Sequence, residues 1–184
     1  MTTRMYVLLS LIILGATALT LLSFGRVPYC ECGHISLWTS TVNGPENSQQ
    51  LSDWYSASHF IHGILFFGLL FLILKRSSIG FRFMLAVTIE AGWELLENSS
   101  IIIDRYREAT MAVGYRGDSV LNSVSDICFM AVGFVFARYM PVWVSVVIVI
   151  FLELFVGYMI HDNLTLNVIM LIYPIDAIKV WQGG

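Results

Sequence analysis

The sequence predicts an all-α integral membrane protein, built as a helical bundle of five or six spans. Of the 184 residues, 57% are hydrophobic and 12% are charged, and the mean hydropathy is +0.76. The charged share is about half of that in soluble domains, which places the chain among multi-pass membrane proteins. The net charge of −3 argues against nucleic acid as a partner. We expect a single membrane domain over 1–184, surrounded by membrane lipids.

The first predicted span covers 5–24. It contains no charged side chain and is long enough to cross about 30 Å of hydrocarbon. A cleaved signal peptide is the alternative, because Ala16-Thr17-Ala18 resembles a cleavage site. The apolar run continues beyond that point, which favours an uncleaved anchor. A polar loop over 25–56 follows.

Four or five further spans follow the loop. Apolar stretches predict them at about 57–74, 81–100, 118–139 and 142–160. A last segment at 164–181 is apolar enough to enter the membrane, but Asn167, Pro174 and Asp176 weaken it. Either a kinked sixth span or an interfacial segment is expected there.

The distribution of charge favours a cytoplasmic N-terminus, because Lys and Arg collect in the cytoplasmic segments of membrane proteins. In that orientation the inner segments carry no acid. Their basic residues are Arg4, Lys75, Arg76, Arg82 and Arg138. The acids of the loops, Asp53 and Asp162 among them, then lie outside. We expect the cell inner membrane, with the loop at 25–56 facing outward.

Three glutamates lie on one face of the predicted third span. At about 100° per residue, Glu90, Glu94 and Glu97 fall within an arc of about 60°. Each carboxylate near mid-bilayer costs roughly 2.5–3.5 kcal/mol, so protons, basic partners or a metal must neutralise them. His59 and His62 open the preceding span and point to neighbouring positions on its surface. The topology places both sets at similar depth, near the outer face.

Imidazole and carboxylate groups in this arrangement are typical ligands of divalent metals. The sequence predicts His59, His62, Glu94 and Glu97 as ligands of an ion such as Zn, Fe or Mn. The match to the di-metal helical bundles is incomplete, because the chain has no Glu-x-x-His. A network of protonated glutamates that joins the helices is the alternative, since burial favours the neutral form of a carboxyl group.

Further polar residues extend this candidate site. Glu90, or Asp126 in the fourth span, would be the general base that activates a water molecule. Arg105 and Arg107 would hold an anionic head group of the substrate, or they simply neutralise the acids beside them. This combination predicts a metal-dependent enzyme acting on an envelope lipid or lipid-linked substrate. A proton- or cation-coupled transporter and a non-enzymatic envelope factor are the alternatives.

Two cysteines and a histidine lie close together in the outer loop. Cys30, Cys32 and His34 have the chemistry to ligate a metal, and the thiols could equally be oxidised in an exported loop. Cys128 lies within the fourth span, where packing is its expected role.

Five stretches carry a family resemblance: PYCECG at 28–33, DWYSASH at 53–59, EAGWELLENS at 90–99, DRYRE at 104–108 and GDSVLNS at 117–123. Together they resemble an uncharacterised family of bacterial inner-membrane proteins, the UPF0314 type. The resemblance covers nearly the whole chain and implies a multi-pass cell-membrane protein, without implying a reaction.

A shorter pattern is similar to VanZ-like membrane proteins. It consists of an acid late in one span, an arginine in the following loop, and an Asp and a Gly seven residues apart in the next span. Its members here are Glu94 or Glu97, Arg105 or Arg107, Asp126 and Gly133. Met130 stands where that family usually has Asn. The resemblance implies a connection with the cell envelope or with glycopeptide tolerance.

Overall fold

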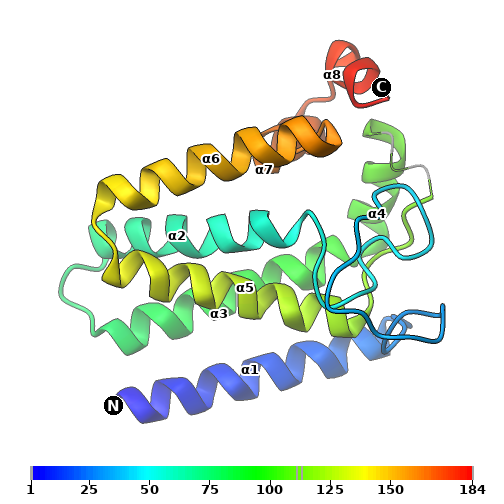
Figure 1. Cartoon of the computed structure of the whole chain (residues 1–184). Helices are drawn as coiled ribbons and strands as arrows, with labels where there is room; N and C mark the ends of the chain where they lie inside the picture. The colour runs from blue at the N-terminus through cyan, green and yellow to red at the C-terminus, as the bar shows by residue number, and fades with distance from the viewer. Residues whose placement is uncertain (1, 111, 113, 184) are drawn as a thin grey trace.

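The computed structural model describes residues 2–110, 112 and 114–183, and over these ranges it contains eight helices and no strand. The prediction of an all-α fold is confirmed. Four of the helices are long and apolar enough to cross a membrane: α1 (Thr3–Ser23), α2 (Ser56–Ile73), α5 (Val120–Tyr139) and α6 (Val142–Ile160). α3 (Ile79–Glu97) has a similar length, but it carries Arg82 and the three glutamates. These five long helices lie side by side as a bundle (Figure 1).

The three remaining helices are short. They are α4 (Ser100–Ala109), α7 (Leu164–Ile172) and α8 (Asp176–Gln182). α7 and α8 divide the predicted segment at 164–181, with Pro174 between them. Nine residues of α7 extend about 14 Å, so neither helix alone crosses about 30 Å of hydrocarbon.

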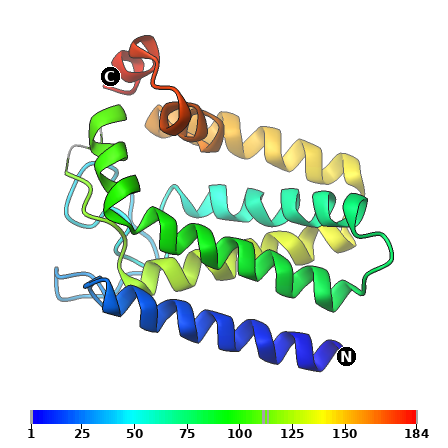
Figure 2. The same ribbon diagram turned by 180° about the vertical axis from the view of Figure 1, so that it is seen from behind.

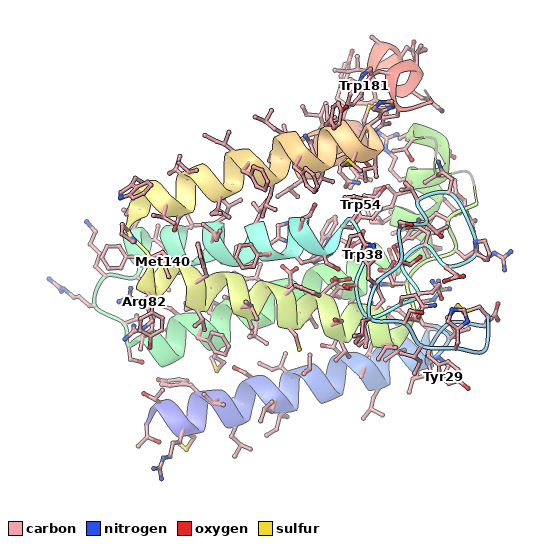
Figure 3. All side chains as sticks on the ribbon, in the orientation of Figure 1. Tyr29, Trp38, Trp54, Arg82, Met140 and Trp181 are labelled. Atoms are coloured by element: carbon pink, nitrogen blue, oxygen red, sulfur yellow. A yellow bond between two sulfur atoms is a disulfide. The ribbon has the colours of Figure 1, made fainter. Side chains whose placement is uncertain are left out.

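The two ends of the bundle differ strongly. The N-terminus and the short turns α2–α3 and α5–α6 lie at one end, the N-terminal end (Figure 2). The long loop between α1 and α2 lies at the other, together with α4, α7 and α8; we call this the loop end. Figure 3 shows the same division, with Arg82 and Met140 at the N-terminal end and Tyr29, Trp38 and Trp54 at the loop end.

α2 and α5 approach closely where a glycine of each helix faces the backbone of the other. A Cβ atom on Gly63 would overlap the carbonyl oxygen of Met130, and a Cβ on Gly133 would overlap that of Phe60. Small residues allow such contact between helices in membranes. The crossing holds the face of α2 that carries His59 against α5.

The apolar core fills the space between α2, α3 and α5 on the N-terminal side of the polar residues. Phe134 is its largest buried side chain and meets Phe67 and Phe83 edge to face. Its buried members are Leu70, Ala86, Val87, Ala91, Ile127, Met130 and Phe134. α1 packs along α3, and α6 lies against α2. Between this core and the loop end, polar side chains replace the apolar ones.

The long loop is attached to the start of α5 by hydrogen bonds. The backbone N–H of Val120 donates to the carbonyl of Val27 (2.9 Å), and the side-chain amide of Asn122 donates to the carbonyl of Gln50 (3.0 Å). Cys30 and Cys32 form a disulfide, so the structure has the oxidised alternative. Cys128, which the sequence placed in packing, is exposed on α5.

Candidate metal centre

Two histidines of α2 direct the same ring nitrogen at one carboxylate of α3. Nδ1 of His59 lies 2.6 Å from Oε1 of Glu90, and Nδ1 of His62 lies 3.0 Å from Oε1 and 3.1 Å from Oε2. Glu90 is fully buried, and the His62 side chain is only 17% exposed. Because residues three apart on a helix are neighbours, both imidazoles meet α3 at a single point. Three groups with metal-ligating chemistry therefore converge there.

Glu94 lies one turn nearer the loop end than Glu90. Its Oε1 is 3.5 Å from Nδ1 of His59. The side chain is fully buried, and within the described part of the chain neither carboxylate oxygen has a hydrogen-bond partner. A buried polar atom without a partner costs about 1–3 kcal/mol, and such groups in native proteins mark catalytic sites or sites of ions and water.

Asp126 of α5 lies on the opposite side of the His59 ring. Its Oδ2 is 3.8 Å from Nε2 of His59, and the hydroxyl of Ser56 donates to its Oδ1 at 3.2 Å. The imidazole is thus held between Glu90 and Asp126. Histidines that ligate a metal usually donate a hydrogen bond from their second nitrogen to a carboxylate or a carbonyl. Asp126 lies on that side of the ring, although 3.8 Å is longer than a hydrogen bond.

Glu97 is half-buried and belongs partly to another set of contacts. The hydroxyl of Tyr106 lies 3.0 Å from Oε1 of Glu97 and 2.7 Å from Oδ1 of Asn167. Candidate ligand atoms of His59, Glu94 and Glu97 nevertheless lie within 4.8 Å of one another, as do those of His59, His62 and Glu90. The four predicted ligands thus fall into two overlapping groups that share His59, and Glu90 joins the group that contains both histidines.

The two arginines predicted to hold a substrate lie outside this cluster. Nε of Arg105 donates to the carbonyl of Leu171 (2.9 Å), which joins α4 to α7. Nε of Arg107 donates to the carbonyl of Tyr115 (2.6 Å), and its Nη1 pairs with Asp104 at 3.3 Å. Both side chains connect the segments of the loop end.

A narrow polar cavity of about 40 Å³ extends from the loop end to the cluster. His59, Glu97 and Asp126 line it, together with three tyrosines that the sequence analysis did not select: Tyr55, Tyr106 and Tyr115. A volume of this size holds on the order of three water molecules. Tyr55 lies four residues before His59, on the same helical stripe, so its position could have been read from the spacing.

Further buried acids lie at the loop end, and two of them, Asp118 and Asp162, line this cavity. Burial raises the pKa of Asp53 to about 6 and that of Asp162 to about 6. Burial also raises the pKa of Asp118, although the hydroxyl of Tyr115 (2.8 Å) and the amide of Asn98 (3.0 Å) donate to its carboxylate. Burial at the loop end therefore makes these carboxyl groups easier to protonate than they are in water.

Comparison with known proteins gives a family but no activity. A family model described as "Protein of unknown function (DUF2585)" matches residues 21–184. A UPF0314 protein of Rhizobium etli is 62% identical over 87% of this chain and 82% of its own length. UPF0314 proteins of Agrobacterium fabrum (57% identical; 89% and 83%) and Novosphingobium aromaticivorans (53% identical; 92% and 88%) are also similar. No solved structure matches the chain.

Proposed function

We propose a function for this chain, which belongs to the UPF0314 (DUF2585) family: it is a multi-pass inner-membrane protein that binds one divalent metal ion through His59, His62 and Glu90. The observation that carries the proposal is the convergence of both Nδ1 atoms on one buried carboxylate, beside the unpartnered carboxyl group of Glu94. Two imidazoles and one carboxylate are the ligand set of several catalytic zinc sites.

The distances and charges are compatible with such an ion. In a tetrahedral site with bonds of about 2.0–2.1 Å, ligand atoms are about 3.4 Å apart. The present separations of 2.6 and 3.0 Å from Glu90 need side-chain shifts of less than about 1 Å to reach that value. The cluster also has more acids than bases, with Glu90, Glu94, Glu97 and Asp126 around two histidines. A bound divalent cation would neutralise part of this excess negative charge and so lower the free-energy cost of burying it.

The geometry favours an exchange of the roles that the sequence suggested for Glu90 and Glu94, which were base and ligand respectively. Glu90 contacts both histidines and is better placed as a ligand than as a base. Glu94 is unpartnered and adjacent to His59, so it is better placed to accept a proton from an attacking water molecule. Asp126 orients His59, and Glu97 is held by Tyr106. The ion would supply Lewis acidity at this position.

The surroundings of the cluster support an enzyme more than a transporter. Water has access through the narrow cavity at the loop end. On the other side the cluster meets the apolar core, where Leu70, Met130 and Phe134 are almost completely buried, so a polar path toward the N-terminal end has no evident lining among the described residues. We propose hydrolysis of an envelope lipid or lipid-linked substrate as the reaction.

Charge supports the orientation within the membrane. The segments at the N-terminal end carry Arg4, Lys75, Arg76 and Arg138 and no acid, whereas acids are frequent at the loop end. Basic residues favour the cytoplasmic side. We propose that the N-terminus is cytoplasmic and that the cavity opens to the outer side of the inner membrane.

Metal titration of the detergent-purified protein tests the proposal. After treatment with a chelator, the wild type should take up about one equivalent of Zn²⁺, Mn²⁺ or Fe²⁺, and His59→Ala and His62→Ala should take up less than a tenth of that. His161→Asn is the matched control: this histidine lies outside the cluster, and Asn tolerates its left-handed backbone (φ 55°). Glu94→Gln should keep the metal and lose hydrolysis of inner-membrane lipids. A wild type without metal uptake would leave a protonated polar network that joins the helices.

A further inference from the structure

A second and much larger cavity lies at the loop end beside the narrow one. Its volume is about 790 Å³, and it lies between the long loop and the segment that leads into α5. Asn47, Tyr115 and Asp118 line both cavities, so the two adjoin there. The narrow cavity in turn reaches His59 and Asp126. A molecule in the large cavity would therefore lie at the entrance to the metal centre.

One cation in the wall of this large cavity has no acidic partner. The side chain of Arg26 is half-buried, and its Nη1 donates to the backbone carbonyl of Arg116. Its Nε is buried without a hydrogen-bond partner, and among the described residues no carboxylate lies within 4.0 Å of the guanidinium. The half-buried guanidinium therefore contributes a positive charge to the cavity wall without a carboxylate paired to it, and such a charge attracts an anion.

The fold makes room for this guanidinium at Gly117. The glycine has φ +89°, and a Cβ atom there would overlap Nη1 of Arg26 and lie 3.0 Å from Oδ1 of Asn98. That Asn98 oxygen also accepts the backbone N–H of Asp118 at 2.7 Å. The Arg26 guanidinium therefore packs against Gly117 and lies close to the hydrogen bond between Asn98 and Asp118, just before the start of α5.

A second arginine lines the same cavity and is open to a ligand. The side chain of Arg116 is 78% exposed, and its Nη1 lies 3.9 Å from Oε2 of Glu31, which is also exposed. Such a surface pair contributes little, so its guanidinium can exchange Glu31 for another anion. Arginine suits phosphate because its planar N–H groups match two oxygens at once.

We propose that Arg26 and Arg116 bind the phosphate group of the molecule on which the metal centre acts. Arg26 lies three residues beyond the end of α1, at the level where the head groups of a membrane are expected. The same chemistry would recognise a lipid phosphodiester or a free phosphate. That the bound molecule is the substrate of the metal centre rests on the proposed function. That an anion binds is argued only from the cavity and its two arginines.

Titration with two probes tests the assignment and separates the sources. Binding of short-chain phosphatidylglycerol is followed by native mass spectrometry of the detergent-purified protein, and binding of inorganic phosphate by calorimetry. Arg26→Gln should weaken binding of the preferred probe at least tenfold, and Arg116→Gln about threefold. Arg76→Gln, an exposed arginine at the N-terminal end, should leave it within twofold. Preference for phosphatidylglycerol identifies a lipid head group, and equal or better binding of phosphate identifies a free phosphate.

Two further variants keep the outcome readable. Arg26→Lys retains the charge and should bind within a few-fold of the wild type, so it replaces Arg26→Gln if that variant melts early. His59→Ala should lose the metal and retain the anion, and Arg26→Gln should do the reverse. Absence of metal from the wild type would remove the proposed function and leave the anion site in place. Unchanged binding of both probes in Arg26→Gln and Arg116→Gln, or no binding by the wild type, overturns the inference.

Discussion

Replacing Glu94 with methionine should stabilise the metal-free protein, although it removes a residue from the centre of the site. Glu94 is fully buried, and both of its oxygens are without a hydrogen-bond partner among the described residues. Its nearest basic group, Nδ1 of His59, is 3.5 Å away and lies closer to Glu90, at 2.6 Å. The Glu94 carboxyl group is therefore removed from water, and no hydrogen bond or close ion pair of its own offsets the cost of desolvation.

The magnitude follows from the two oxygens. At about 1–3 kcal/mol for each unsatisfied polar atom, their burial costs roughly 2–6 kcal/mol. Methionine is unbranched and adapts to the space, so the one missing non-hydrogen atom should cost less than about 1 kcal/mol. Replacement of buried ion pairs by apolar groups of similar volume is often neutral or gains about 1–4 kcal/mol, and Glu94 resembles that case because its removal leaves His59 paired with Glu90. We expect a gain in that range, which raises Tm by about 2–4 °C for each kcal/mol in a chain of this length.

Thermal unfolding in detergent with a chelator present is the assay. Glu97→Met is the matched control, because Glu97 lies on the same face of α3 but accepts a hydrogen bond from Tyr106. Loss of this hydrogen bond in Glu97→Met should lower the free energy of unfolding by about 1 kcal/mol. A lower Tm for Glu94→Met than for the wild type would refute the reasoning and would mean that the Glu94 carboxyl group has a stabilising partner in the folded protein.

Three other predictions concern the framework of the site. Burial raises the pKa of Asp162 to about 6 from an ordinary value of 3.8, so this acid stabilises the fold while it is protonated and the contribution is lost as the pH rises from about 4 to 6. Asp162→Asn should remove up to roughly 3 kcal/mol of that pH dependence in unfolding measurements at pH 4 and 7. Gly133→Ala should lower stability by about 1–3 kcal/mol or more, because its Cβ would meet backbone of α2, whereas Gly68→Ala, with open space around it, should have no such cost. In intact cells an impermeant maleimide should label Ser40→Cys and not Ser77→Cys, and the reverse pattern would invert the proposed orientation.

The fold could be predicted from the sequence to a large extent because long apolar runs bounded by polar residues mark the long helices. The five long helices begin and end within a few residues of the predicted spans at 5–24, 57–74, 81–100, 118–139 and 142–160. The break between α7 and α8 does not follow from the sequence, since an apolar segment with one proline is compatible both with a kinked span and with an interfacial segment. α4 was not predicted as a separate helix, because Ser99 and Ser100 give only a weak signal for an interruption after α3.

The candidate site was less predictable because its details depend on the rotation and tilt of the helices. Glu90, Glu94 and Glu97 are separated by about 60° or less around α3, so the sequence could not say which of them meets the histidines. The structure decides this through the contact of His59 and His62 with Glu90. The arginines depend on a helix that was not predicted: Arg105 and Arg107 lie on α4 and bond to backbone carbonyls, and their predicted role in holding a substrate stays a prediction.

The close crossing of α2 and α5 connects stability with the geometry of the site. His59 lies one turn before Gly63 on α2, and Asp126 lies two turns before Gly133 on α5. Any residue larger than glycine at the crossing must move the helices apart, and the separation between His59 and Asp126 must increase with it. Small residues at this point therefore do more than permit packing, because they fix the imidazole between Asp126 and Glu90. Measuring metal affinity in Gly133→Ala beside its stability would show this coupling as a loss of affinity with all ligands still present.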